Sequence, residues 1–131
     1  MKQFYLAGGI AGLPFGESNG WRAFLEDRLD EVKIINPLKY YNYEMRMHNS
    51  EKEIRNFELN LVRHSDLIIV NFNQPNSIGT AQELAVAYEH RIPIVGLNQD
   101  KNELHPWLVE CVDKMLYSMK DLVDYVRCYY C

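Results

Sequence analysis

Short apolar runs alternate along the chain with longer stretches in which apolar residues recur every three or four positions. The first pattern is typical of strands buried in a parallel sheet, and the second of amphipathic helices. The predicted strands are residues 4–7, 32–35, 67–72, 92–97 and 115–117. The predicted helices are residues 18–30, 51–64, 79–90, 104–113 and 119–127. This alternation predicts an α/β protein with a flavodoxin-like, doubly wound five-stranded parallel sheet of order 2-1-3-4-5.

Length and composition narrow the class of protein. A chain of 131 residues with 47% hydrophobic and 24% charged residues fits one globular domain, residues 1–131. Its 14 Lys and Arg against 18 Asp and Glu give a net charge of -4, which does not favour a nucleic acid polymer as partner. The N-terminal apolar run is too short for a signal peptide, and no apolar stretch approaches membrane-spanning length. We therefore expect a cytoplasmic protein with no membrane partner.

The three cysteines lie near the C-terminus. Cys128 and Cys131 have the spacing of a redox or zinc half-site, but neither a second cysteine pair nor a suitably spaced histidine pair completes it, and Cys111 stands alone. A frayed tail is the better interpretation of this segment. We expect no metal site and no cofactor.

A glycine-rich segment, residues 7–16, follows the first predicted strand, where a dinucleotide-binding protein carries its phosphate loop. No G-x-G-x-x-G register runs through Gly8 and Gly9, and the second strand ends in Asn36 and Pro37 instead of an acidic residue. The Lys and Ser/Thr of a P-loop are also missing. The segment therefore argues against NAD and ATP, and predicts a loop of small residues whose backbone N–H groups can approach a sugar or a phosphate.

The most informative segment runs from the third predicted strand, through residues 65–72, into residues 76–85. It reads as a buried strand, a polar loop and a helix with Glu83 in its first turn. In an open α/β sheet, this position faces the ligand crevice at the carboxyl ends of the strands. Glu83 is then placed to act on a small molecule, or it only complements the helix dipole. Both interpretations stay open at this point.

A long irregular stretch, residues 38–50, contains several Tyr and Met residues, among them Tyr41. Loops of this length in compact domains are usually functional or disordered, and the aromatic content argues against disorder. One interpretation is a lid or a wall on which a base stacks. The alternative is that these side chains pack on the sheet edge or on a partner subunit.

Three blocks, residues 5–10, 79–88 and 93–97, together with the strand that follows Asp66, resemble the nucleoside 2-deoxyribosyltransferases. That superfamily also contains the 2'-deoxynucleoside 5'-monophosphate N-hydrolases. The resemblance extends over nearly the whole chain, and the Gly-Thr-Ala-x-Glu-Leu-Ala block at residues 79–85 is its most specific part.

The resemblance implies that Glu83 is a nucleophile that attacks C1' of a 2'-deoxynucleoside and forms a covalent deoxyribosyl ester, as in a retaining glycosidase. It also implies that the Tyr5 hydroxyl positions this nucleophile, although a tyrosine in a strand can be a plain core residue. The family carries an acidic Asp eight residues before the Asp of the third strand. Counting back from Asp66 gives Glu58, with Asn60 beside it. Glu58 keeps acid chemistry possible, but Glu on a helix is more often solvated.

Two segments, the first loop and the residues just before the nucleophile, separate transfer from hydrolysis within the superfamily. Six residues before the nucleophile, the hydrolases carry a Ser that donates to the 5'-phosphate, and this chain has Ser77. The hydrolases also carry Ser and Arg in the first loop, where this chain has Gly9 and Ala11. The missing Arg removes a bidentate phosphate ligand. The resemblance therefore implies a transferase that moves deoxyribose between nucleobases. The alternatives are a monophosphate N-hydrolase and a non-catalytic nucleotide sensor.

The family also places a polar residue of one subunit in the site of another. The matching stretch, residues 103–108, makes His105 the candidate. Its alternative role is that of a helix N-cap before Pro106. The remaining expected substrate contacts are Gly8, Gly9, Gly79 and Tyr41. The implied partners are a nucleoside or nucleotide, a nucleobase and further copies of the chain, as a homodimer or larger homo-oligomer.

Overall fold

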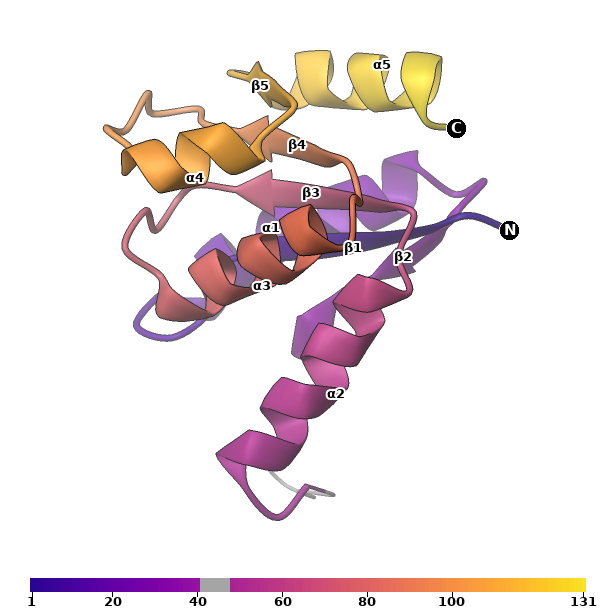
Figure 1. Cartoon of the computed structure of the whole chain (residues 1–131). Coiled ribbons are helices and arrows are strands. Elements are labelled where there is room, and N and C mark those ends of the chain that lie inside the picture. Colours follow the sequence, from indigo (N-terminus) through magenta and orange to yellow (C-terminus); the bar gives the residue numbers. More distant parts are fainter. Residues whose placement is uncertain (41–47) are drawn as a thin grey trace.

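The structure is a computed structural model that describes residues 1–40 and 48–131 (Figure 1). The strands are β1 (Gln3–Gly8), β2 (Lys33–Ile35), β3 (Leu67–Asn71), β4 (Ile94–Leu97) and β5 (Lys114–Leu116). The helices are α1 (Phe15–Arg28), α2 (Glu51–Arg63), α3 (Ile78–Glu89), α4 (Pro106–Cys111) and α5 (Met119–Tyr129), with a short 3-10 helix, η1 (Pro37–Tyr40).

The five strands form one parallel sheet in the order β2-β1-β3-β4-β5, which confirms the predicted fold class. Within this order β1 pairs with β2 on one side and with β3 on the other. The register pairs Phe4 with Leu67 and Gly8 with Asn71. The loops after β1 and β3 therefore leave the sheet side by side, at the switch point where ligands of doubly wound folds bind.

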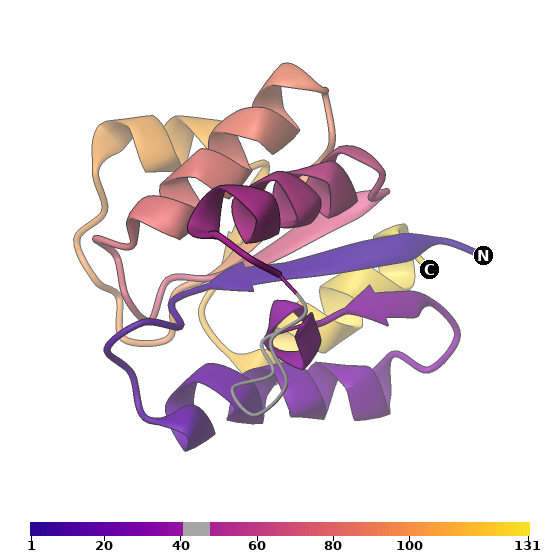
Figure 2. The same ribbon diagram turned by 90° about the horizontal axis from the view of Figure 1, so that it is seen from below.

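Alternate residues of the central strands supply two separate apolar cores. Phe4 and Leu6 pack with residues of α1 and α5 on one face of the sheet. Tyr5 and Ala7 face the opposite side and pack with residues of α2, α3 and α4. Viewed from below, α2 and α3 lie together on one side of β1, and α1 lies on the other (Figure 2). This alternation places the Tyr5 side chain in the layer that holds α3.

The helix boundaries differ most from the prediction in α1 and α4. α1 begins at Phe15, directly after Pro14, whose φ of -56° suits a helix entry. Gly16 lowers helix propensity there, which explains why the sequence pattern places the start later. α4 is shorter than predicted, because His105 is its N-cap and Pro106 its first residue.

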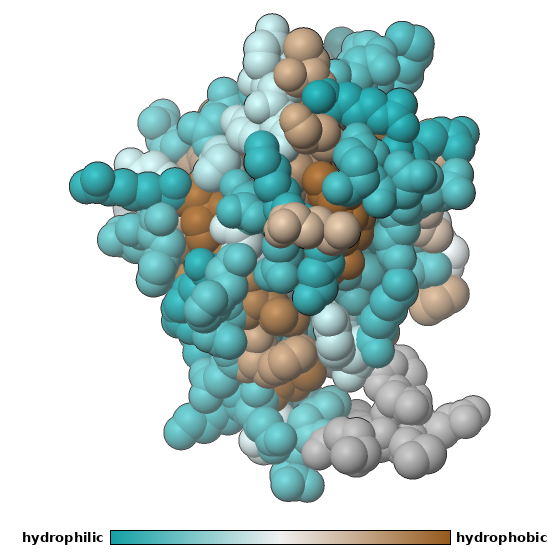
Figure 3. All heavy atoms as spheres, turned by 90° about the vertical axis from the view of Figure 1, so that its right-hand side faces the viewer, coloured by the Kyte–Doolittle hydropathy of each residue, from teal (hydrophilic) through white to brown (hydrophobic). Residues whose placement is uncertain are grey.

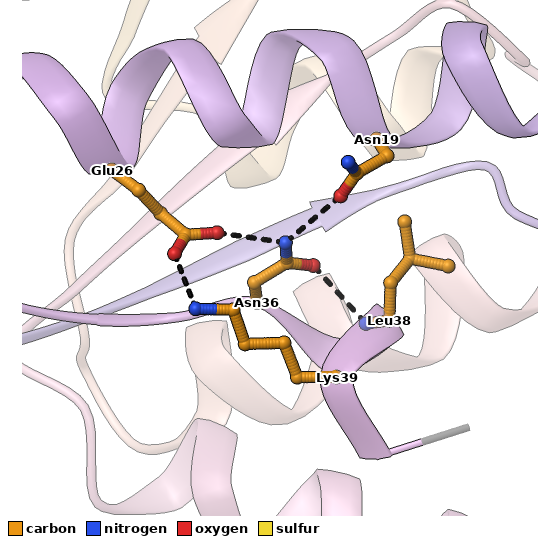
Figure 4. Close-up of polar contacts among 5 residues, drawn as sticks. All are labelled: Asn19, Glu26, Asn36, Leu38 and Lys39. Atoms are coloured by element: carbon orange, nitrogen blue, oxygen red, sulfur yellow. Dashed lines mark hydrogen bonds and ion pairs between the residues drawn. The ribbon is translucent and has the colours of Figure 1, made fainter. Parts of the chain in front are cut away.

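Part of the stretch predicted to be irregular, residues 38–50, is ordered by a polar network at its start (Figure 4). The buried Asn36 amide donates to Asn19 Oδ1 (3.2 Å) and to Glu26 Oε1 (2.8 Å). Its own Oδ1 accepts the Leu38 N–H, and Lys39 pairs with the second oxygen of Glu26. These contacts hold η1 against α1.

Helices cover both faces of the sheet. The surface at the end where the strands begin is mainly polar. Figure 3 shows this side, which carries both chain termini, with small hydrophobic patches among hydrophilic residues. In the part of the chain that the structure describes, no helix has the length and apolar character needed to cross a membrane.

Candidate active site

A pocket of about 370 Å³ opens at the carboxyl ends of β1 and β3. It is lined by the loop after β1, by one face of α2 and by the start of α3. Its volume is in the range of small-molecule sites. Of the residues expected in the site, it brings together Gly8, Glu58, Ser77, Gly79 and Glu83.

Tyr5 and Glu83 are in direct contact beneath this pocket. Tyr5 has no exposed surface, Glu83 is 9% exposed, and the Tyr5 hydroxyl donates a short hydrogen bond to Glu83 Oε2. Because Tyr5 comes from a central strand and Glu83 from a helix packed on that strand, neither group moves freely. The carboxylate is therefore held in a fixed orientation at the pocket wall.

The sequence prediction placed Glu83 in the first turn of its helix, and this placement was wrong. α3 begins at Ile78, and its first turn holds no acidic residue. Residues in a second turn are too far along the helix to bond its free N–H groups. The carboxylate of Glu83 contacts Tyr5 instead, so the helix dipole does not explain why a carboxylate is buried here.

Burial raises the pKa of Glu83 from its ordinary value of 4.5 to about 8. The Tyr5 hydrogen bond and the positive charge of Arg22 oppose this change, and the negative charge of Glu58 adds to it. Tyr5 has a raised pKa as well, chiefly because it is buried and secondly because Glu83 is near. The pair thus places two titratable groups with raised pKa values in a desolvated place, a pattern common at catalytic sites.

Glu58 lies half-buried in the pocket wall, and its charge acts on both Tyr5 and Glu83. The lining residues of α2 recur at helical spacing on one face of the helix: Glu51, Lys52, Ile54, Arg55, Glu58 and Leu59. Asn60 is two positions beyond Glu58, roughly 200° around the helix. It is exposed and does not line the pocket. The structure therefore brings Glu58 to Glu83 and leaves Asn60 outside.

Ser77 is the N-cap of α3 at the pocket rim. Its Oγ accepts hydrogen bonds from the Thr80 N–H (3.3 Å) and from the Thr80 hydroxyl (3.0 Å). With both acceptor positions used, the Ser77 hydroxyl proton is left to donate. The neighbouring Gly79 has open space where a side chain would stand, so a ligand can approach the helix start closely.

Packing disfavours a side chain at Gly8, the last residue of β1, and at Gly9, which follows it. A Cβ on Gly8 would meet Trp21 Cζ2 at 3.0 Å and the Asn71 carbonyl oxygen at 3.2 Å. A Cβ on Gly9 would overlap the Gln74 side chain, at 2.2 Å from Oε1. Gly8 lines the pocket together with Ala11, whereas Gly9 is not among the lining residues. Gly9 therefore shapes the loop against Gln74.

His105 and Tyr41 lie away from the pocket as the structure describes it. His105 is exposed, and its Nδ1 accepts the Trp107 N–H as the N-cap of α4, which was the alternative interpretation. Tyr41 lies outside the described residues.

Sequence reasoning missed Arg22 and the polar rim of α2. Arg22 has no exposed surface, although Arg is almost never fully buried. Its spacing from Ser18, Leu25 and Leu29 is that of one helix face, which could have placed it inside. At the rim, Arg55 Nε donates to Gln82 Oε1 at 2.7 Å. Both rim residues line the pocket, together with Lys52.

The pocket thus combines a fixed carboxylate, a second carboxyl group and a hydroxyl donor at a helix start. This set can support covalent catalysis followed by proton transfer. No cluster of three or more His, Cys, Asp or Glu side chains suited to a metal ion occurs among residues 1–40 and 48–131.

The sequence pattern of the nucleoside 2-deoxyribosyltransferase family matches residues 4–124. The chain belongs to this family.

Solved structures agree with the fold of this family. A conserved protein from Enterococcus faecalis V583 superposes with a TM-score of 0.84 at 18% identity, covering 98% of both chains. A 2-deoxyribosyltransferase from Bacillus psychrosaccharolyticus gives a TM-score of 0.79 at 15% identity, covering 94% of this chain and 91% of the other. The CMP N-glycosidase BcmB from Clostridium botulinum gives 0.71 at 16% identity, covering 98% and 99%. A comparison with curated protein sequences gives no match.

Proposed function

We propose that the chain cleaves the N-glycosidic bond of 2'-deoxynucleosides and transfers the deoxyribosyl group to another nucleobase, with Glu83 as nucleophile. The observation that carries this proposal is the buried Glu83 carboxylate, held by the Tyr5 hydroxyl at the wall of a pocket of nucleoside size. Family membership supports a transferase or N-glycosidase. A nucleotide sensor would have no use for a desolvated carboxylate in this position.

In the first step, a Glu83 oxygen forms an ester bond to C1' while the bond from C1' to the base nitrogen breaks. The base leaves with the electron pair, and Glu58 supplies the proton that neutralises it. In the second step, a nitrogen of the incoming base attacks C1', the ester bond breaks and the Glu83 carboxylate is restored. Glu58 accepts the proton that the incoming base loses. The two inversions retain the configuration at C1'.

The alternative is a 2'-deoxynucleoside 5'-monophosphate N-hydrolase, in which water replaces the incoming base. Ser77 favours this alternative, because its hydroxyl proton is available to an anion at the start of α3. Ala11 favours transfer, because it lines the pocket where the hydrolases carry an Arg. We rank transfer first for this reason.

Covalent trapping tests the nucleophile. We expect a 2-fluoro-2-deoxy nucleoside analogue to label the protein, and peptide mass mapping to place the label on Glu83. Glu83→Gln should abolish the labelling. Glu89→Gln, which changes an exposed carboxylate of the same helix, should leave it unchanged. Labelling that survives Glu83→Gln would exclude the proposed nucleophile.

Product analysis separates the two reactions. The protein is incubated with deoxyinosine plus adenine, and separately with each deoxynucleoside monophosphate, and the products are separated by chromatography. Transfer yields deoxyadenosine in the first mixture. Release of free base from the monophosphates alone would instead support the hydrolase.

A further inference from the structure

Arg22 is a fully buried cation that the proposed reaction does not use directly. It lies on α1, on the opposite side of β1 from Glu83. Its guanidinium donates to the backbone carbonyls of Leu6 (3.4 Å), Gly8 (3.2 Å) and Ser18. Two of these carbonyls belong to the carboxyl end of β1, and Gly8 lines the pocket. Arg22 thus ties the strand end and α1 together directly behind the pocket wall.

Within residues 1–40 and 48–131, every hydrogen bond of the Arg22 side chain ends on a backbone carbonyl, and none ends on a carboxylate. A buried charge is costly unless an opposite charge lies near. The acidic groups that act on the Arg22 guanidinium through their charge are Glu83 and Glu58, and Tyr5 adds to them. Arg22 and Glu83 are therefore two buried groups whose charges stabilise each other across β1.

We propose that Arg22 is a positioning residue whose fixed positive charge favours the anionic form of Glu83, and that it also holds the Gly8 carbonyl at the pocket wall. This inference rests on the proposed role of Glu83. Arg22 does not touch substrate, because it is fully buried behind the strand end.

The charges that face Glu83 explain why such a residue is needed. Tyr5 on β1 donates a hydrogen bond to the carboxylate, Glu58 on α2 repels it, and Arg22 on α1 attracts it. Burial alone favours the neutral carboxylic acid, which is a poor nucleophile. The pKa of Arg22 is lowered by burial only to about 10. Arg22 therefore stays charged at neutral pH, and its charge raises the fraction of Glu83 that is anionic there.

The direct test is the titration of the Glu83 carboxyl carbon by 13C NMR, with the signal assigned through its loss in Glu83→Gln. An opposite charge within a few ångströms lowers a carboxyl pKa by about 1 to 3 units. We expect Arg22→Gln to raise the Glu83 midpoint by about 1 pH unit. Arg22→Lys, which keeps the charge, should hold it within about 0.5 unit. The control Arg28→Gln removes a half-exposed charge from the same helix and should not move it.

A second measurement needs no Arg22 variant and remains available if Arg22→Gln does not fold. The guanidinium 13C and 15N signals of Arg22 in the unaltered protein should shift with the midpoint of Glu83, and this step should disappear in Glu83→Gln. The proposal would be overturned if the Arg22 signals did not shift with the titration of Glu83. It would also be overturned if a folded Arg22→Gln protein had an unchanged Glu83 midpoint.

Covalent labelling then tests whether the Arg22 charge affects the reaction of Glu83 with the substrate analogue. Below the Glu83 midpoint, a rise of one pKa unit reduces the anionic fraction about tenfold. Labelling by Arg22→Gln should therefore fall about tenfold at neutral pH and recover at higher pH. A uniform loss at every pH would indicate a purely structural role. Absence of labelling in the unaltered protein would refute the proposed function, whereas the NMR titrations would still test Arg22.

Discussion

The hydrogen bond between Tyr5 and Glu83 joins a hydroxyl without exposed surface to the carboxyl group of the proposed nucleophile. Tyr5→Phe keeps the ring in the core and removes only the hydroxyl. A hydrogen bond to a charged group contributes about 1.5–3 kcal/mol, so we expect the rate of covalent labelling to fall about 10- to 100-fold. The acidic limb of the pH profile should move upward, because the Tyr5 bond lowers the Glu83 pKa. The rate of covalent labelling, measured at a series of pH values, shows both effects.

Tyr88→Phe is the matched control for this change. Tyr88 lies on α3, like Glu83, but it is 59% exposed. It should therefore lose neither rate nor pH dependence. A Tyr5→Phe protein with an unchanged profile would mean that the hydroxyl does not position Glu83.

Glu83 should also lower the stability of the folded protein at neutral pH. Its carboxyl has a pKa near 8 when folded and 4.5 ordinarily. Between these values the unfolded chain has released the proton that the folded protein retains. Each pH unit in this window therefore costs the folded state about 1.4 kcal/mol at most. Below pH 4.5 both states hold the proton, and this cost is absent.

We accordingly predict that Glu83→Gln becomes steadily more stable than the unaltered protein as pH rises from 4.5 toward 8. The neutral amide keeps an acceptor for the Tyr5 hydroxyl and carries no buried charge. Urea unfolding at a series of pH values gives the difference in unfolding free energy. A difference that is constant with pH would show that the carboxyl titrates normally in the folded protein.

At the scale of the element, three helices begin with the same serine cap. Ser50, Ser77 and Ser118 each accept the backbone N–H three residues ahead. Loss of such a cap costs about 1 kcal/mol. We predict that Ser77→Ala and Ser118→Ala lose similar stability in urea unfolding, and that only Ser77→Ala loses activity, because Ser118 caps α5 away from the pocket. Equal activity of the two variants would exclude a substrate role for Ser77.

The elements were predictable where local chemistry determines them. The apolar runs at 67–72 and 92–97 become β3 and β4, because strands buried on both faces need continuous apolar residues. The start of α1 was missed, because glycine propensity is a weak guide where packing of Trp21 and Leu25 decides. Ile54 and Val62 mark the buried face of α2, and Asn60 lies on the opposite face. This pattern would have excluded Asn60 from the pocket.

At the scale of the whole molecule, the motif around Glu83 is local and was predictable, whereas the contacts of Arg22 were not. A charged residue in a helix is expected to face solvent. Only the folded arrangement reveals that α1 crosses behind β1 and presents Arg22 to three carbonyls. The contacts that set the Glu83 pKa come from α1, α2 and β1, so they depend on topology. Local sequence therefore identifies the proposed nucleophile, and the fold determines its charge.

The last prediction concerns completion of the site by a second copy of the chain. His105 and Trp107 are exposed at the start of α4, and Trp107 is 81% exposed, so both are available to a partner. If His105 of one copy serves the Glu83 of another, Glu83→Gln and His105→Ala should each lose activity when tested alone. Mixed in equal amounts and allowed to exchange, they should recover about a quarter of the unaltered activity, because half of the random dimers contain one intact site out of two. The control mixture contains His64→Ala in place of His105→Ala, because His64 is an exposed histidine at the end of α2. The activity of this mixture should equal the activity that its His64→Ala protein has when tested alone. Recovery no greater than the sum of the separate variants would place the complete site within one chain.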